Sequence, residues 1–144
     1  MYLTGSRKHS LDSKVRLTLP ADMRREFAEK VCLVPLNDAL YGFTPDGHRA
    51  WVDGFFPDGF NQRSRDDVRL RQLLNSRTVT VDIDSAGRIA LGKVPEDVRA
   101  KLGLAGEVMV VGNDDHFELW NVEEWERAQE AFDDDLEALM FGGM

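Results

Sequence analysis

Two stretches of the chain are close copies of each other: LDSKVRLTLP at residues 11–20 and IDSAGRIALG at residues 83–92. Each opens with an apolar residue and an Asp-Ser pair, which favours a turn, and continues into the alternating apolar and polar pattern of a strand. A cation leads that strand in both copies, Arg16 in the first and Arg88 in the second. The recurrence indicates a chain built from two related units.

The similarity continues beyond these stretches. PADMRREF at residues 20–27 is echoed, after a three-residue insertion, by PEDVRAKL at residues 95–102. A proline at the first helical position, followed by an acidic residue, is typical of a helix start, because the missing N–H is harmless there and the helix dipole favours anions. Two apolar strands are predicted after each short helix, at residues 31–34 and 40–44 in the first copy and at 107–111 and 117–121 in the second.

Each unit spans only about 45 residues, which is too few to bury a stable core alone. We therefore expect the two units to pair around a pseudo-two-fold axis in one small mixed barrel, with equivalent loops on the same side. The expected fold class is α+β and mainly β. The predicted organisation is a first half-domain at residues 5–51, a linker loop and helix at 52–77, a second half-domain at 78–122 and a C-terminal helix at 123–144.

The segments outside the repeats contain two predicted helices. Residues 53–62, DGFFPDGFNQ, are expected to form a loop that its phenylalanines pin to the barrel. Ser64 and Asp67 form a capping pair for the helix that follows, and Asn121 and Glu124 form one for the last helix. That last helix has an apolar stripe of Trp125, Ala128, Phe132, Leu136, Leu139 and Met140. Either the chain's own barrel or a neighbouring subunit can cover this stripe.

The composition, 42% hydrophobic and 31% charged over 144 residues, is that of a globular protein. No apolar run approaches the roughly 18 residues of a membrane span, and the first ten residues lack the apolar core of a signal peptide. Cys32 has no partner for an internal disulfide and is expected to be a buried apolar residue. These features predict a cytoplasmic protein that does not associate with membranes.

Charge is unevenly distributed along the chain. The net charge of −8 opposes DNA binding at long range. Residues 1–30, however, contain seven Lys and Arg against four Asp and Glu, and residues 61–105 contain nine against six. Residues 106–144 contain one against twelve. The cations therefore accompany the repeated stretches, and the acidic residues are concentrated elsewhere.

The repeated loops are candidates for binding nucleic acid. In the second loop, Asp84 can cap neighbouring amides and Gly87 tolerates positive φ, so D-S-A-G forms a turn that leaves Arg88 at its edge. The first copy offers cations in the same places, and the preceding strand enlarges its basic patch. The candidate DNA-binding residues are Arg16, Arg88, Lys14, Arg7 and Lys8. Two such loops together can bind phosphates and the O6 and N7 atoms of guanine, whereas one alone would more simply be a solvated turn.

The repeated stretches, the two helical turns and EVMVVGNDDHFELWNVEEW at residues 107–125 together resemble the MraZ family of bacterial transcriptional regulators, whose members have two AbrB-like swapped-hairpin half-domains. The similarity runs from about Leu3 to Glu126. It implies sequence-specific binding to short direct repeats of double-stranded DNA upstream of the division and cell-wall gene cluster, usually as a repressor. It also implies ring-shaped homo-oligomers, an octamer or similar, that associate with the nucleoid.

In that family a D-x-K-G-R loop faces DNA, and the resemblance therefore points to Lys14 and Arg16 in the first half and to Arg88 in the second. The chain departs from the pattern at one position, where Val15 replaces the family's glycine. A β-branched residue strongly disfavours positive φ, so the first loop must either take another conformation or store strain. Gly87 keeps the residue that the turn requires.

Two other functions fit the sequence less well. An antitoxin of the AbrB type also binds DNA and wraps a toxin with its acidic tail, but it usually has one hairpin unit per chain and a disordered tail. An enzyme is not indicated, because His9, His48 and His116 lack metal-ligand spacing and no Gly-rich phosphate loop is present. We expect no cofactor, no metal and no small-molecule substrate. The arginines between residues 63 and 77 are most simply a solvated, salt-bridged helix face.

Overall fold

The structure is a computed structural model that describes residues 1–142. Its main sheet has six antiparallel strands in the order β1 (Ser6–Ser10), β7 (Glu107–Asn113), β8 (His116–Asn121), β4 (Leu40–Phe43), β3 (Lys30–Pro35) and β5 (Val79–Asp82). A second sheet contains only β2 (Arg16–Thr18) and β6 (Arg88–Ala90). The helices are α1 (Ala21–Arg24), α2 (Pro45–Asp53), α3 (Arg65–Ser76), α4 (Glu96–Leu102), α5 (Val122–Ala128) and α6 (Phe132–Phe141), with a 3₁₀ turn, η1, at Leu91–Lys93.

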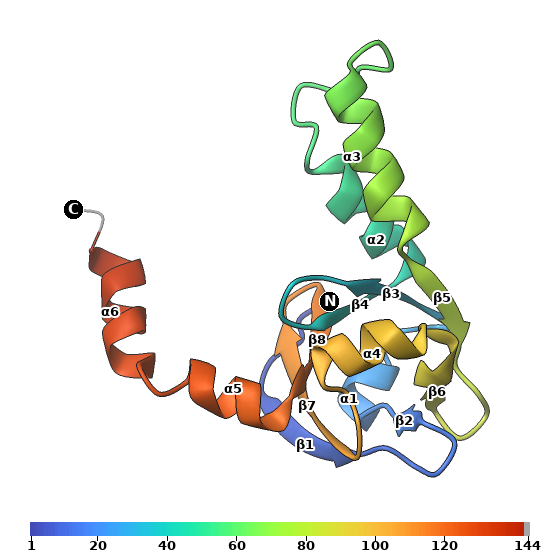
Figure 1. The fold of residues 1–144 in the computed structure, drawn as a ribbon, viewed down its shortest axis with the longest axis vertical. Helices are drawn as coiled ribbons and strands as arrows, with labels where there is room; N and C mark the ends of the chain where they lie inside the picture. Colours follow the sequence, from blue (N-terminus) through green and yellow to red (C-terminus); the bar gives the residue numbers. More distant parts are fainter. Residues whose placement is uncertain (143–144) are drawn as a thin grey trace.

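The two halves of the chain exchange strands (Figure 1). Strand β1 pairs with β7 of the C-terminal half, and β5 pairs with β3 of the N-terminal half. The halves meet again where β4 pairs with β8 and where β2 pairs with β6. Neither half therefore completes its sheet alone, as the small size of each unit requires. The predicted α+β class is confirmed, and the structure shows that the main sheet is antiparallel.

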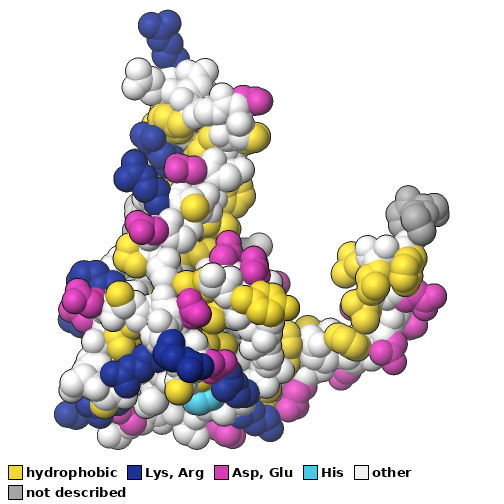
Figure 2. Space-filling view, turned by 180° about the vertical axis from the view of Figure 1, so that it is seen from behind, with side chains coloured by type: hydrophobic (Ala, Val, Ile, Leu, Met, Phe, Trp, Pro, Cys, Tyr) yellow, Lys and Arg dark blue, Asp and Glu magenta, His cyan; other side chains and the backbone are white. Residues whose placement is uncertain are grey.

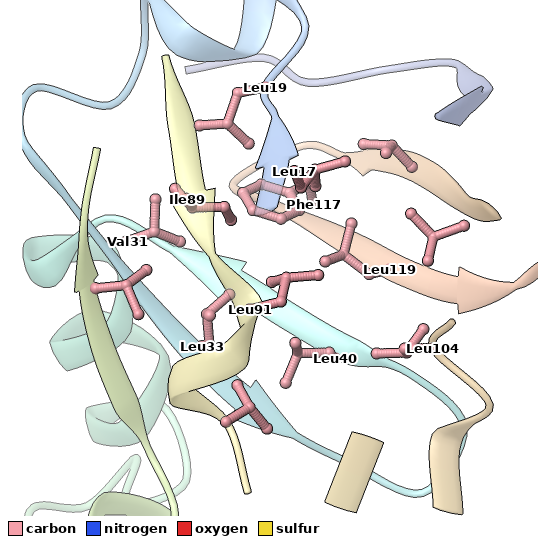
Figure 3. Close-up of a cluster of buried hydrophobic side chains, with 14 of the residues drawn as sticks. Leu17, Leu19, Val31, Leu33, Leu40, Ile89, Leu91, Leu104, Phe117 and Leu119 are labelled. Atoms are coloured by element: carbon pink, nitrogen blue, oxygen red, sulfur yellow. The ribbon is translucent and has the colours of Figure 1, made fainter. Parts of the chain in front are cut away.

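The main core lies between the six-stranded sheet and the β2–β6 ribbon (Figure 3). Leu17 and Ile89 face each other across the ribbon and are fully buried. Phe117 packs edge-on against Phe27 at 5.5 Å between ring centroids. Burying one such side chain contributes about 1.5–3 kcal/mol, and each half supplies residues to the same core. This shared core fixes the two repeated loops relative to one another.

The two short helices at equivalent places start as the repeat predicts, with one shift. Pro20 and Pro95 are the residues immediately before α1 and α4, so each proline caps its helix rather than occupying the first helical position. Acidic residues still fill both first turns, where the helix dipole favours them. The helix α4 ends at Gly103 with a φ of 67°, which is a common way to terminate a helix.

Helix α2, which the sequence analysis did not predict, packs against β3 and β4. The Oγ1 atom of Thr44 accepts a hydrogen bond from the backbone N–H of Gly47 at 2.9 Å and so caps the helix. Trp51 of this helix stacks on Phe43 and covers a second, smaller core that contains Cys32. Cys32 is buried, as predicted.

The segment between the halves extends away from the two sheets as a pair of helices, α2 and α3 (Figure 1). Ser64 caps α3 by accepting from the N–H of Asp67 at 3.2 Å, as predicted. The phenylalanine-rich loop does not pin itself to the barrel as expected. It packs on the helices instead, with Phe55 against Trp51 at 5.2 Å and the guanidinium of Arg71 3.4 Å from the ring centre of Phe60.

The C-terminal helix is broken in two. Asn121 caps α5 by accepting from the N–H of Glu124 at 2.9 Å, as predicted. The expected continuous helix, however, stops after Ala128, and the last two residues of its range, 143–144, lie outside the described residues. The second piece, α6, stands away from the barrel (Figure 1). No helix within residues 1–142 is long and apolar enough to cross a membrane.

Candidate nucleic-acid interface

Loop 1 (residues 12–16) is organised by one carboxylate. The Oδ1 atom of Asp12 accepts hydrogen bonds from the backbone N–H groups of Lys14 and Arg16, both at 2.9 Å. Its Oδ2 atom accepts from Nε of Arg16 at 2.7 Å. Loop 2 (residues 84–88) repeats these bonds, with Asp84 accepting from the N–H of Ala86 at 3.0 Å, the N–H of Arg88 at 2.9 Å and Nε of Arg88 at 2.8 Å. The two loops are therefore chemical copies.

The backbone of the two loops is also the same at the position where the sequence differs. Val15 has a φ of 58° and Gly87 has a φ of 80°. The carbonyl of Val15 accepts from the N–H of Leu91 at 3.0 Å, and that of Gly87 accepts from the N–H of Leu19 at 2.9 Å. Of the two expected outcomes, the structure has the second: loop 1 keeps the conformation of loop 2 at the expense of strain at Val15.

Arg16 and Arg88 project from the same outer face of the β2–β6 ribbon. Arg16 lies opposite Ala90, and Arg88 lies opposite Thr18. Because side chains alternate along a strand and the residues between them are buried, both arginines point away from the core. We call this surface the ribbon face, defined by Arg16, Thr18, Arg88 and Ala90. The side chains of Arg16 and Arg88 are 27% and 34% exposed.

The aspartates leave part of each guanidinium free. Each arginine uses its Nε to bind the loop carboxylate, and among residues 1–142 the Nη1 and Nη2 groups of Arg16 and Arg88 have no hydrogen-bond acceptor. The pKa of Asp12 and of Asp84 lies below the usual range, chiefly because the backbone N–H of the following arginine donates to the carboxylate, with the guanidinium adding to the effect. The carboxylates therefore stay charged and hold the arginines in one orientation.

Each Arg–Asp pair is electrically neutral as a unit, so attraction for phosphates must come from other cations. Lys14 lies exposed in loop 1 beside the ribbon face. Arg7 and Lys8, the other two candidates, are consecutive residues of β1 and so point to opposite faces of the sheet. Each also faces an acid: Arg7 donates to both carboxylate oxygens of Asp22, at 2.8 and 2.6 Å, and Nζ of Lys8 lies 3.7 Å from Glu126.

Arg24 is a residue at this site that the sequence analysis did not select. It follows β2, in α1, and its Nη2 donates to the carbonyl of Ser85 in loop 2 at 3.1 Å. The guanidinium also covers Gly87, since a Cβ atom at that residue would lie 2.8 Å from Nη1 of Arg24. Its counterpart in the repeat, Arg99, donates instead to the carbonyl of Val94 at 3.1 Å. Loop 2 is therefore braced by an arginine from the other half, and loop 1 is not.

Two of the three histidines, His48 and His116, are occupied in structural contacts. His48 hydrogen-bonds through Nε2 to Thr78 at 2.9 Å, and both ring nitrogens of His116 face carboxylates. Within residues 1–142 no group of His, Cys, Asp and Glu is arranged to hold a metal ion. The ribbon face is thus the place where equivalent, oriented and partly unsatisfied cationic groups come together.

Comparison with known proteins gives a consistent family. The family model of the MraZ protein, which is described as antitoxin-like, matches residues 74–139. A protein of Spiroplasma kunkelii named "Transcriptional regulator MraZ" is 29% identical over 128 residues, covering 88% of this chain and 86% of its own. The proteins of the same name from Mycoplasmoides gallisepticum and Desulforapulum autotrophicum are both 30% identical, covering 88% and 90% of this chain and 87% and 86% of their own.

Two of these relatives are 30% identical over 88% and 90% of this chain, which is enough identity and coverage to show the family. The chain belongs to the MraZ family.

Proposed function

We propose that this chain is a transcriptional regulator that binds double-stranded DNA through the ribbon face. Its relatives are named transcriptional regulators. The observation that carries the proposal is the equivalence of Arg16 and Arg88, which share one outer face and have the same loop hydrogen bonds and free Nη groups. The DNA target of the protein is a set of short direct repeats upstream of the division and cell-wall gene cluster. The protein acts there as a repressor. It is located in the cytoplasm, in association with the nucleoid.

The recognition step uses the free end of each guanidinium. Two parallel N–H groups match the O6 and N7 acceptors of guanine in the major groove, and each such pair discriminates against a wrong base by about 1–3 kcal/mol. Because Asp12 and Asp84 occupy Nε, the Nη1 and Nη2 groups are the ones that reach the base. An arginine held in place before binding loses less side-chain entropy on binding than a free one.

Phosphate contacts come mainly from Lys14 in loop 1, whereas Arg7 and Lys8, which point to opposite faces of β1 and each face an acid, contribute less. A single subunit with a net charge of −8 binds DNA weakly, since its acidic segments repel the polyanion. A ring of subunits overcomes this weakness, because linked sites that engage successive repeats raise affinity by about 10²- to 10⁴-fold without any new contact.

The exchanged strands favour a particular fold for this function. Two AbrB-like half-domains, residues 5–51 and 78–122, would each place its hairpin within the sheet of the other, and the pairing of β1 with β7 and of β5 with β3 supports this swapped-hairpin arrangement. Residues 52–77 then form a projecting linker and residues 123–144 a C-terminal extension. Such pairing keeps both DNA-facing loops on one surface.

The test is a gel-shift titration with a duplex from upstream of the chain's own gene, against the same duplex with scrambled repeats, at two salt concentrations. Arg16→Ala and Arg88→Ala are each expected to weaken binding about 5- to 150-fold while circular dichroism and oligomer mass stay unchanged. Arg127→Ala is the matched control, because it removes one exposed cation from α5, where Arg127 pairs with Glu124 at 2.6 Å. Equal binding by Arg16→Ala, Arg88→Ala and the control rules out the ribbon face as the DNA site.

One observation favours the alternative function, an AbrB-type antitoxin. Helix α6 exposes apolar side chains beside four acidic ones, as a segment that binds a toxin would. Isolation of the full chain from its native cells distinguishes the two functions. Co-purification of one small protein at equal stoichiometry supports an antitoxin, whereas isolation of the chain with its own promoter DNA and no such partner supports a regulator.

A further inference from the structure

Helix α6 presents an apolar face that no other part of residues 1–142 covers. Leu139 is 87% exposed, the highest value among the large apolar residues of residues 1–142. The other exposed members of the face are Phe132, Leu136, Met140 and Phe141. Figure 2 shows these apolar atoms gathered on α6, with acidic side chains beside them. Burying them would contribute roughly 25 cal/mol for each Å² removed from water, so an uncovered face of this size indicates a partner.

A groove of suitable character lies elsewhere on the molecule. It has a volume of about 700 Å³ and runs between the C-terminal part of α3, the start of β5 and the helix α4. Its apolar lining includes Leu73, Leu74, Val79, Val94, Val98 and Leu102. Arg77 and Lys101 stand at its rim with one acid, Asp97. The groove can therefore receive large apolar side chains from a segment that is itself acidic.

Charge complementarity identifies α6 as that segment. The charged residues that line the groove are Arg77, Lys101 and Asp97, so cations outnumber acids there, and the other four arginines of residues 63–77 lie outside its lining. Residues 130–141, which include α6, contain five acids and no cation. Complementary charges at the rim of an apolar contact favour this pairing and disfavour binding of α6 to another α6, since two acidic helices repel each other.

We propose that α6 of one subunit docks in the α3–α4 groove of a second copy of this chain. This inference deepens the proposed function, on which it rests, because it names the surfaces that build the oligomer. The chain's own groove is a poor target for α6: Trp125 of α5 packs on Trp120 of β8 at 5.3 Å, and α5 leads α6 away from α3 (Figure 1). A contact between two different surfaces is head-to-tail, and such contacts close into a ring when the rotation allows.

The first test measures oligomer mass by analytical ultracentrifugation of the full chain. Leu139→Asp on α6 and Leu73→Asp in the groove are each expected to convert the oligomer to smaller species, because each puts a charge into the apolar contact. Both sites are exposed, so folding is expected to survive, and circular dichroism checks it. Tyr2→Asp is the matched control, since Tyr2 is an exposed apolar residue outside both surfaces. An unchanged mass for both variants overturns the proposal.

The second test shows which chain supplies α6. Leu139→Cys and Leu73→Cys are made in separate chains, with the buried Cys32 left in place. Oxidation of the mixture is expected to give a disulfide-linked dimer that neither variant gives alone. A chain with both substitutions that closes on itself at monomer mass overturns the second-copy assignment. Failure of the mixture to cross-link would also overturn this assignment. So would the finding that a small foreign protein binds α6 while the chain still self-associates.

These readouts separate the two proposals. Arg16→Ala and Arg88→Ala are expected to lose DNA binding and keep the oligomer mass. Leu139→Asp is expected to dissociate the oligomer into smaller species. It should also weaken DNA binding by about 10²-fold or more, because the multivalency of the oligomer is lost. Cross-linking without any DNA binding by the unaltered chain would contradict the proposed function and leave this interface standing.

Discussion

Val15 and Gly87 occupy the same position of two equivalent loops, with φ of 58° and 80°, although only Gly87 lacks a side chain. The hydrogen bonds around Asp12 and Asp84 explain why the backbone does not differ, since each carboxylate holds the loop closed from three donors. Loop 1 therefore contains strain that loop 2 lacks. The two loops present their arginines alike but are unequal in local stability.

Gly87→Ala is expected to lower the free energy of unfolding by about 1–2 kcal/mol, because an L-residue at this φ is disfavoured. Its Cβ would also meet the guanidinium of Arg24. Val15→Gly is the reciprocal change and is expected to change the free energy of unfolding by less than about 1 kcal/mol, since relief of strain of roughly 1–3 kcal/mol is offset by the flexibility of glycine and by the lost packing of the Val15 side chain on the core. Urea denaturation of both variants checks the pair, and a neutral Gly87→Ala would contradict the argument.

Arg24 is expected to act on DNA through loop 2. Arg24→Ala removes the hydrogen bond to the carbonyl of Ser85 and should weaken operator binding about 5- to 10-fold, in keeping with the loss of roughly 1 kcal/mol of loop support. Arg25→Ala removes the same charge from the next residue and serves as the control. The decisive measurement is the double variant: if Arg24 works by positioning Arg88, Arg24→Ala should have no further effect in an Arg88→Ala background.

His116 should make stability depend on pH. Burial alone lowers its pKa, but hydrogen bonds to Glu118 and Asp115, both at 2.9 Å, outweigh burial and raise the pKa above its ordinary value of 6.5. A raised pKa stabilises the fold fully below pH 6.5, and this contribution is lost as pH rises through the raised value. For Glu118, burial raises the pKa, but donors led by His116 lower it overall, so its contribution is lost as pH falls below 4.5.

The unfolding free energy measured between pH 4 and 9 should therefore fall on the alkaline side in the unaltered chain. His116→Gln should remove most of this decrease at alkaline pH. It should also lower the free energy of unfolding by about 1–3 kcal/mol near pH 6, because buried Glu118 loses a charged hydrogen-bond donor. Asp115→Asn should reduce the slope without abolishing it. If the free energy of unfolding of His116→Gln decreases at alkaline pH as much as that of the unaltered chain, the titrating group is another residue.

Local patterns in the sequence predict the loops, and long-range contacts decide the rest. The spacing of Asp84, Gly87 and Arg88 is a short-range signal, and the turn forms as predicted. The brace from Arg24 to Ser85 joins residues 61 positions apart, so no local pattern contains it. The same reason explains why only the family resemblance, and no local pattern, pointed to exchanged strands, since pairing partners depend on the completed sheet.

The helices show a second limit on prediction from the sequence. Thr44 followed by Pro45 is a recognisable helix start. Because Thr44 is also the last residue of a strand that the repeat predicts, the sequence was interpreted as a strand and the helix was not predicted. The break after α5 arises where the apolar stripe passes from contact with the barrel to open solvent. Ala131, which precedes α6, offers no side-chain cap, so the stripe alone suggested one continuous helix.

Phe117 offers a final test, because it sits where the two halves join. Its cross-strand neighbours are both glycines, Gly42 on β4 of the other half and Gly112 on β7. A Cβ atom at Gly42 would overlap the Phe117 ring, which is fully buried and cannot move aside. Gly42→Ala should therefore cost about 1–3 kcal/mol through overpacking.

The matched control is Gly92→Ala, where the nearest atom to an added Cβ is the carbonyl oxygen of Lys14 at 3.9 Å. Chemical denaturation should show a large loss for Gly42→Ala and a small one for the control. Because the junction fixes loops 1 and 2 relative to each other, Gly42→Ala should also weaken operator binding under conditions where the protein is still folded. Operator binding that stays at the control's level would show that the ribbon face is positioned independently of the β4–β8 junction.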